Sequence, residues 1–315
     1  MNADPAPFCS AVIPVYNSAG VVGATIAACE KFFTSQGLTY EIVAVDDGST
    51  DGSWDVLKAC AAANPRVVTV RLLRNYGQHS AVHCGLVMSR GEQVVILDDD
   101  LQNPPEEIVH LMRAAEEGAD VVFGKFARKR HSLPRRIGSW LTNHINTAVF
   151  DKPSDLVLTN FKLIHRRVVD RMLAHRTHFP YINGLAVLYA RKAVNVHVEH
   201  RERTIGRSNY RLLPILKLLA RILFNYSAFP LRLLTLIGVI VALFSFTVAV
   251  YVFAKALFVG TSVPGWASVA FMLAFFNGIT LLVLGVVGEY VVRILTETNR
   301  ADPYHVVETN RADDD

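Results

Sequence analysis

Residues 93–107 read QVVILDDDLQNPPEE, an uncharged run rich in β-branched residues that ends in three consecutive aspartates. The run is typical of a buried strand, and the two prolines with the glutamates after them are typical of a helix start. In an extended segment alternate side chains share a side, so Asp98, Asp100 and Gln102 are expected to face one point and Asp99 to face away. Two carboxylates and an amide oxygen at one point suit Mg²⁺ or Mn²⁺. A solvated acidic turn that caps the next helix is the alternative.

The rest of the first 125 residues repeats this alternation of short apolar runs and helical patterns. It predicts strands over 9–15, 40–45, 67–73, 93–97 and 120–123. Strands that alternate with helices predict an α/β, Rossmann-like fold with a mostly parallel sheet and helices on both faces. The sequence contains neither G-x-G-x-x-G nor a Walker A motif, which disfavours dinucleotide and P-loop chemistry.

Polar residues follow each of the first four strands directly. Because ligands of open α/β sheets bind beyond the carboxyl ends of the strands, these residues are expected to converge on one crevice. The carboxylates of Asp46 and Asp47 could accept hydrogen bonds from a base or a ribose, and a turn that caps a helix is the alternative. The other residues of these clusters include Pro14, Tyr16, Asn17, Asn75, Gly77 and Gln78.

Composition narrows the class of protein. Of the 315 residues, 51% are hydrophobic and 19% are charged. Most of the apolar surplus lies in the last third, which rules out a purely soluble enzyme, a disordered chain and a repeat array. The net charge of +4 gives no indication of nucleic-acid binding. The four cysteines are widely spaced, so reduced thiols in a cytosolic domain are expected.

Two uncharged stretches, 233–254 and 266–288, are each long enough to cross a bilayer, and glycine and proline break the chain between them. They predict a transmembrane hairpin over 230–290, with helices at about 233–257 and 266–289. Arginines at its entry and exit predict cytoplasmic ends. Two buried helices of a soluble protein are the alternative. The hairpin could also hold a homo-oligomer together through the close-contact positions Gly278, Gly285 and Gly288.

Basic residues gather in two segments. One spans 125–136 and includes Arg128, and the other contains Arg203 and precedes a leucine-rich basic helix predicted over 210–229. Arginine can hold a phosphate through two hydrogen bonds, and contact with anionic lipid is the alternative. The helix at 210–229 is expected to lie in the membrane interface, or else to pack on the globular domain.

Four motifs, at 13–17, 46–51, 74–81 and 98–106, resemble in order and spacing those of the GT-A fold glycosyltransferases of family 2. With the hairpin, the chain is similar to the polyprenyl-phosphate glycosyltransferases, such as dolichol-phosphate mannose synthase and undecaprenyl-phosphate formamidoarabinose transferase. It departs from their pattern at Asp99, where alanine is usual, at Asn209, where lysine is usual, and in the segment 155–162, where an acidic residue and glycine are usual.

The resemblance implies a role for each matching residue. The catalytic set would be Asp98, Asp100 and Arg203, with Asp98, Asp100 and Gln102 holding Mg²⁺ or Mn²⁺. The donor-binding residues would be Pro14, Tyr16, Asn17, Asp46, Asp47, Asn75, Gly77, Gln78 and Asp99. The acceptor phosphate would contact Arg128, Lys162, Arg203, Ser208 and Tyr210.

The implied reaction is the transfer of a sugar, with inversion, from a nucleotide sugar, expected to be UDP-linked, to undecaprenyl phosphate or a related polyprenyl phosphate. The product would serve a cell-envelope glycan or the modification of lipid A. A cytoplasmic catalytic domain (1–209), the interfacial helix (210–229), the hairpin (230–290) and a cytoplasmic tail (291–315) would form a multi-pass protein of the bacterial inner membrane. A processive polysaccharide synthase and a non-catalytic nucleotide-sugar-binding scaffold are the alternatives, although the sequence lacks the Q-x-x-R-W segment of the former.

Overall fold

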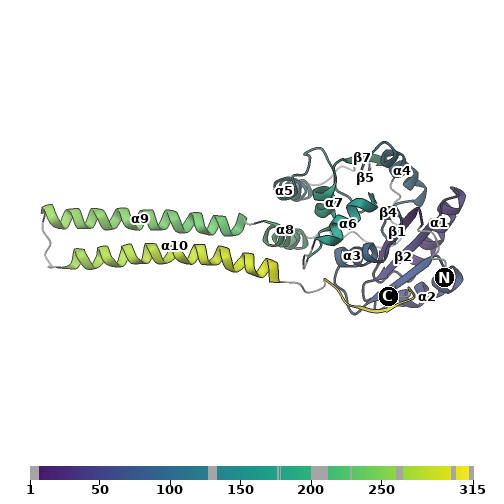
Figure 1. Ribbon diagram of the computed structural model, residues 1–315, viewed down its shortest axis with the longest axis horizontal. Helices are drawn as coiled ribbons and strands as arrows, with labels where there is room; N and C mark the ends of the chain where they lie inside the picture. The colour runs from purple at the N-terminus through teal and green to yellow at the C-terminus, as the bar shows by residue number, and fades with distance from the viewer. Residues whose placement is uncertain are drawn as a thin grey trace. The chain divides into compact units, whose positions relative to one another are not determined.

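The computed structural model describes residues 7–126, 133–175, 177, 179–199, 212–227, 229–259, 265–298 and 303–311. The chain divides into two units (Figure 1). The first comprises Met1–Leu219 together with Ala301–Asp315, and the second comprises Ala220–Arg300.

The first unit is built on an eight-stranded sheet in the order β7-β5-β6-β4-β1-β2-β3-β8. All five expected strands are present, and three more join them. β6 runs antiparallel to β4 and β5, and β8 runs antiparallel to β3, so the sheet is mixed, while the other six strands run in one direction as expected. The strands are β1 (Cys9–Val15), β2 (Tyr40–Asp46), β3 (Val67–Leu72), β4 (Gln93–Ile96), β5 (Val121–Phe126), β6 (Lys162–His165), β7 (Ala193–Val198) and β8 (Val306–Thr309).

Helices cover both faces of this sheet. They are α1 (Val22–Ser35), α2 (Ser53–Ala63), α3 (Gln78–Met88), α4 (Ile108–Glu116), α5 (Leu133–Phe150), α6 (Arg166–Ala174) and α7 (Ile182–Tyr189), and a short 3₁₀ turn, η1 (Pro105–Glu107), precedes α4. The helix expected from Pro104 therefore begins as this 3₁₀ turn. It starts with proline because its first N–H groups need no intrahelical acceptor.

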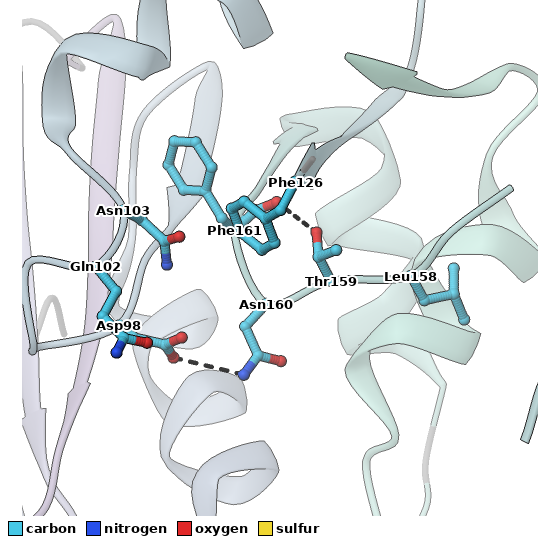
Figure 2. Close-up of a pocket in the computed structure, with 8 residues that line it drawn as sticks. All are labelled: Asp98, Gln102, Asn103, Phe126, Leu158, Thr159, Asn160 and Phe161. Carbon is cyan, nitrogen blue, oxygen red and sulfur yellow. Dashed lines mark hydrogen bonds between the residues drawn. The ribbon is translucent and has the colours of Figure 1, made fainter. Parts of the chain in front are cut away.

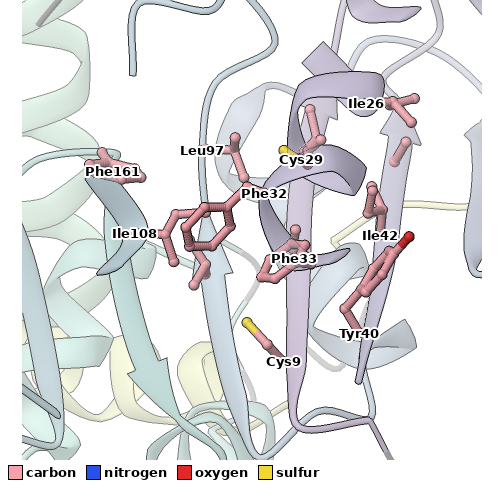
Figure 3. Packing of buried hydrophobic residues seen from close by; sticks show 14 of the residues in the cluster. Cys9, Ile26, Cys29, Phe32, Phe33, Tyr40, Ile42, Leu97, Ile108 and Phe161 are labelled. Atoms are coloured by element: carbon pink, nitrogen blue, oxygen red, sulfur yellow. The ribbon is translucent and has the colours of Figure 1, made fainter. Parts of the chain in front are cut away.

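Burial on two faces explains why the central strands are continuously apolar. Every residue of β1 and β2 is buried. Ile13 belongs to the cluster that holds Phe33 of α1, whose ring stacks on Tyr40 with centroids 5.1 Å apart (Figure 3). Val12 faces the opposite helix, α3, so closely that a Cβ on Gly85 would come within 2.3 Å of its side chain. Such two-sided burial is typical of parallel strands.

The C-terminal residues return to the sheet. Residues 291–315 are a tail in the sequence prediction, but α10 (Trp266–Thr298) runs on into this segment and residues 306–309 then form β8 beside β3. The Asn310 side chain accepts the Thr69 N–H at 2.8 Å and donates to the Val67 carbonyl at 3.0 Å. The far end of the chain is thus an integral part of the first unit.

The second unit contains a helical hairpin made of α9 (Phe229–Val259) and α10. Two segments, Thr235–Lys255 and Ser268–Val292, have mean hydropathies of 2.6 and 2.3 and are candidate membrane spans. Of an 18-residue window in each segment, 0% and 6% of the residues are buried within the described structure. The described residues therefore give no support to the alternative of two helices buried in a soluble core, and the crossing of a membrane stays a prediction.

Two of the glycines named above face the neighbouring helix of the hairpin. A Cβ on Gly278 would lie 3.6 Å from the Ala242 side chain, and a Cβ on Gly285 would lie 3.8 Å from Thr235. Both are ordinary van der Waals distances, and a role of these glycines in a homo-oligomer stays a prediction. The basic helix predicted over 210–229 forms as α8 (Leu212–Tyr226), and its first two expected residues lie outside the described part of the chain.

Candidate functional site

The loops after β1 and β2 are bonded to each other at the carboxyl ends of these strands. The Asn17 N–H donates to the Ser49 hydroxyl at 3.0 Å, and the Asn17 side-chain oxygen accepts the Thr50 N–H at 2.9 Å. Asn17 has a φ of +52°, a conformation that asparagine tolerates better than most residues. Of the neighbouring candidates, Pro14 is buried in β1, past the last residue that β4 pairs with, and Tyr16 is 47% exposed.

The carboxylates of Asp46 and Asp47 are buried, and most of their oxygen atoms accept hydrogen bonds within the protein. Asp46 accepts the Ser49 N–H at 3.2 Å, and its second oxygen lies 3.6 Å from Nε of Arg71. Asp47 accepts the backbone N–H groups of Tyr76 and Gly77 at 2.7 and 2.9 Å. Burial raises the pKa of Asp47, and these two hydrogen bonds act in the opposite direction.

The loop after β3 presses against the loop after β2 at Gly48. This glycine has a φ of +67°, and a Cβ there would come within 2.5 Å of the Arg74 backbone and 2.7 Å of the Asn75 nitrogen. The Asp47 hydrogen bonds hold the following residues of the same loop. Donor-binding candidates from three strands, including Asn75 and Gly77, therefore lie along one edge of the sheet, and Asn75 is exposed there.

The aspartate segment does not have the extended conformation assumed from the sequence. Leu101 has a φ of +58°, and Asp100 accepts the Gln102 N–H at 3.2 Å, so the segment turns. The Asp99 carboxylate receives hydrogen bonds from the Ser18 side chain and the Tyr16 backbone, and its pKa is raised by burial and by the charge of Asp100. The prediction of an extended backbone over Asp98 to Gln102 is therefore wrong, and the turn sets the positions of these side chains.

Asp98 and Gln102 line one cavity, of about 330 Å³, at this edge (Figure 2). Asp98 accepts a hydrogen bond from the Gln78 amide at 2.7 Å and lies 3.5 Å from the Asn160 amide nitrogen. The Asn160 nitrogen is also 3.3 Å from the Gln78 oxygen. The remaining lining residues are Asn103, Phe126, Leu158, Thr159 and Phe161. Amides and a hydroxyl beside two aromatic rings can meet the hydroxyl groups and the apolar face of a sugar ring.

Negative charge accumulates at Asp98. Burial raises its pKa to about 6, the charge of Asp100 contributes in the same direction, and the charge of Lys162 opposes them. Two nearby carboxylates favour either a shared proton or a cation. Asp98 and Asp100, with the Gln102 amide, could supply oxygen ligands to Mg²⁺ or Mn²⁺, and phosphate oxygens and water would complete the shell. The described residues contain no group of three His, Cys, Asp or Glu side chains placed to hold a metal.

Lys162 is in β6 and is buried behind the cavity. Its ammonium donates to the side-chain oxygen of Asn183 at 2.7 Å and to the carbonyls of Thr159 and Asn160 at 3.2 and 3.3 Å. Burial lowers its pKa to about 7, against the opposing effect of Asp98. These three acceptors give Lys162 a role in supporting residues 159–160, and contact with an acceptor phosphate stays a prediction.

His79 is the nearest titratable neighbour on α3. Its ring lies edge-on to Phe179 and Tyr181, with centroids 5.8 and 5.1 Å away. Burial lowers its pKa to about 4, and the charge of Lys162 acts in the same direction. His79 is thus a buried ring that packs edge-on against two aromatic side chains.

Asn160 is a site residue that the sequence did not predict. The predicted donor and metal residues of the loops follow strands, whereas Asn160 precedes one. Because β6 is antiparallel to β4, with Lys162 opposite Ile96, the residues before β6 lie at the edge where β4 ends. The antiparallel pairing could not be seen in the local pattern. Four expected acceptor residues, Arg128, Arg203, Ser208 and Tyr210, lie outside the described part of the chain.

Solved structures with a similar fold include glucosyl-3-phosphoglycerate synthase from Mycobacterium tuberculosis in complex with Mn²⁺ and UDP-glucose. It is 19% identical, the match covers 70% of this chain and 79% of that one, and the TM-score is 0.50. The same enzyme with Mn²⁺, UDP-glucose and phosphoglyceric acid gives 18% identity, 69% and 79% coverage, and a TM-score of 0.51. Mannosyl-3-phosphoglycerate synthase from Rubrobacter xylanophilus is 18% identical, the match covers 69% of this chain and 74% of that one, and the TM-score is 0.50.

These likenesses concern the fold, and the sequence itself gives the family. Residues 10–174 match the domain described as glycosyl transferase family 2. The matched segment contains β1 to β6 and all the residues that line the Asp98 cavity. Since it spans more than half of the 315 residues, this chain belongs to glycosyl transferase family 2.

Proposed function

We propose that this glycosyltransferase moves a sugar from a nucleotide sugar, UDP-linked in our proposal, to a polyprenyl phosphate in a membrane, with inversion at the anomeric carbon. The membrane would be the bacterial inner membrane and the lipid undecaprenyl phosphate. The observation that carries the proposal is that one chain combines the Asp98 cavity with two long apolar helices whose side chains are exposed.

The donor side of the proposal rests on the edge formed by the loops after β1 to β4. Asp47 holds the backbone of residues 76–77, and Gly48 lets this loop approach the loop that carries Asp46. Tyr16 offers an exposed ring at the same edge, suited to stack on a nucleobase. Mn²⁺ and UDP-glucose are bound in the synthase of similar fold, which agrees with a nucleotide-sugar site of this kind.

The proposed cofactor is Mg²⁺ or Mn²⁺ held by Asp98, Asp100 and Gln102. A divalent ion there would neutralise the charge of the departing nucleoside diphosphate. The chain's own part is to hold Asp98 through the Gln78 and Asn160 amides, which donate hydrogen bonds and bring no further negative charge to the two carboxylates.

The acceptor side rests on the hairpin. The Thr235–Lys255 and Ser268–Val292 segments have the length and hydropathy of bilayer spans. Residues on both sides of the hairpin belong to the first unit, since residues 306–309 pair with its sheet. Two crossings satisfy that connection, with the catalytic domain and both termini on the cytoplasmic side. A hairpin of this kind would hold the catalytic domain at the membrane surface, where a lipid acceptor lies.

Chemistry also favours a phosphate acceptor. A phosphate monoester has a second pKa of about 6 and is largely dianionic at neutral pH, so its oxygen needs no strong general base. The enzyme must bring two anions together, and we assign Arg128 and Arg203, with Ser208 and Tyr210, to the lipid phosphate. A single displacement by that oxygen forms the new bond at the anomeric carbon, the bond to the nucleoside diphosphate breaks, and the configuration inverts.

The test is a transfer assay with the full-length protein in detergent and Mn²⁺. Labelled UDP-sugars and GDP-mannose are offered with undecaprenyl phosphate or with 3-phosphoglycerate. We expect one sugar per lipid in the organic phase, with the anomeric configuration inverted by NMR, and no product with EDTA. Transfer to 3-phosphoglycerate alone would contradict the proposal. A polymeric product would contradict it and favour a processive polysaccharide synthase. Nucleotide binding without transfer would contradict it and favour a non-catalytic scaffold.

A second experiment tests the membrane part alone. Phe244 lies mid-helix in α9 and is 70% exposed, so Phe244→Lys would put a charge at the bilayer centre, at a cost of about 3 kcal/mol. Phe258, 85% exposed near the end of α9, supplies the matched control, because lysine there can reach the interface. We expect alkaline carbonate to extract more of Phe244→Lys than of Phe258→Lys. Full extraction of the wild type would contradict membrane insertion.

A further inference from the structure

The C-terminal strand enters the sheet at the same edge as the donor loop. β8 is antiparallel to β3, with Val306 opposite Leu72 and Thr309 opposite Val70. The residues that precede β8 therefore lie beside the carboxyl end of β3, as the residues that precede β6 lie beside the end of β4. The His305 carbonyl accepts the Leu73 N–H at 2.9 Å, which extends the pairing into the loop after β3.

Two side chains just before β8 contact the elements that carry donor-binding candidates. The His305 ring lies edge-on to Tyr76, with centroids 6.3 Å apart. Tyr76 is the residue whose N–H Asp47 binds, and its ring also packs under the Arg74 guanidinium at 5.2 Å. Tyr304 packs against His83 of α3, with centroids 5.8 Å apart. The C-terminal segment thus touches both the donor loop and the helix that follows it.

The other end of β8 is firmly held. Asn310 exchanges side-chain hydrogen bonds with the start of β3, and the Arg311 guanidinium pairs with the Glu41 carboxylate. The side chains of Arg311 and Glu41 are only 15% and 6% exposed, and Glu41 also accepts the Ser10 hydroxyl at 2.6 Å. Loss of either partner of a buried ion pair destabilises the protein strongly, because the other charge is left buried and unpaired. β8 is therefore fixed along its length, and His305 cannot move freely with respect to the sheet.

We propose that His305, held in place by β8, positions the donor loop, so that binding of the nucleotide sugar depends on this residue. His305 acts through Tyr76: its ring and its carbonyl hold residues 73–76, and Asp47 holds residues 76–77 from the opposite side. The inference rests on the proposed function, because it takes this loop as part of the nucleotide-sugar site. It gives the return of the chain from α10 to the sheet a purpose beyond closing the sheet edge.

The test compares three variants in the full-length protein. His305→Ala removes the ring contact, His305→Phe keeps an aromatic ring, and Val307→Thr changes an exposed residue of the same strand. UDP and GDP are titrated calorimetrically in the presence of Mn²⁺, and the donor KM and kcat are measured. We expect His305→Ala to weaken nucleotide binding and raise the donor KM about fivefold, with kcat nearly unchanged. His305→Phe restores most of the affinity, and Val307→Thr matches the wild type.

The outcomes separate this inference from the function on which it rests. A wild-type protein that binds neither nucleotide overturns both. Wild-type affinity in His305→Ala overturns the inference alone, as does an affinity in His305→Phe as low as in His305→Ala, because either result denies the ring contact a role. Thermal unfolding of each variant shows whether His305→Ala has merely lost the strand: a fall in Tm well beyond about 2 °C, shared by His305→Phe, also counts against the inference.

Discussion

The loops after β2 and β4 both carry neighbouring aspartates at one edge of the sheet, yet they use them differently. Asp47 gives its two oxygens to backbone N–H groups of the next loop, so it shapes the protein. Asp98 receives side-chain amides and faces a cavity, with Asp100 close enough to raise its pKa. The two loops therefore differ in what binds their carboxylates, which is backbone N–H groups at Asp47 and side-chain amides at Asp98.

The largest expected effect comes from the loop after β4. Asp98→Asn keeps the oxygen that accepts the Gln78 amide but removes the charge, so we expect transfer activity to fall about a thousandfold, equivalent to about 4 kcal/mol. The Tm of the metal-free protein should not fall, because the substitution relieves repulsion from Asp100. Asp55→Asn, on the exposed face of α2, is the matched control. If Asp98→Asn lowered the Tm and left transfer activity intact, Asp98 would act on stability as Asp47 does, and the two loops would not differ.

The corresponding change after β2 should act on stability first. Asp47→Ala leaves the N–H groups of Tyr76 and Gly77 without their acceptor, which we expect to cost about 3 kcal/mol in total. Thermal unfolding should show a Tm lower by several degrees, and the donor KM should rise with the loss of loop order. If Asp47→Ala unfolded at the same temperature as the wild type, the Asp47 carboxylate would not stabilise the fold as described.

Gly48→Ala tests the contact between the two neighbouring loops. The φ of +67° and the approach to the Arg74 backbone leave no room for a methyl group, so we expect a loss of about 2 kcal/mol in the free energy of unfolding. Gly20, which has nothing within 4 Å of its Cβ position, provides the control substitution Gly20→Ala. Denaturant unfolding of the two variants should differ, and equal midpoints would contradict the close approach.

A dependence on pH belongs to Asp98. Its carboxyl ionises near 3.8 in an unfolded chain but near 6 in the folded protein, so folding takes up a proton between these values. The metal-free protein should lose stability as the pH rises from about 4 to about 6 and keep that loss above 6. Affinity for Mn²⁺ should fall about tenfold per pH unit below 6. Asp98→Asn should abolish the dependence of both stability and Mn²⁺ affinity on pH. If both still changed with pH as in the wild type, a group other than Asp98 would be responsible.

Much of the fold could be predicted because the first five strands are buried on both faces and stand out as apolar runs. The clusters after them followed from the rule for parallel strands. The turn at Leu101 could not be foreseen, since leucine carries no local preference for positive φ. Asn160 and His305 were not predicted because they precede β6 and β8, and the antiparallel pairing of these strands cannot be seen in the local sequence.

In the proposed site, Asp98 and Asp100 hold a divalent ion that in turn binds a nucleoside diphosphate. Electron paramagnetic resonance of Mn²⁺ with the full-length protein tests this directly, through the fraction of bound ion with and without UDP. We expect UDP to increase Mn²⁺ binding to the wild type and Asp98→Asn to lose this increase. Equal Mn²⁺ binding by the wild type and Asp98→Asn in the presence of UDP would contradict it.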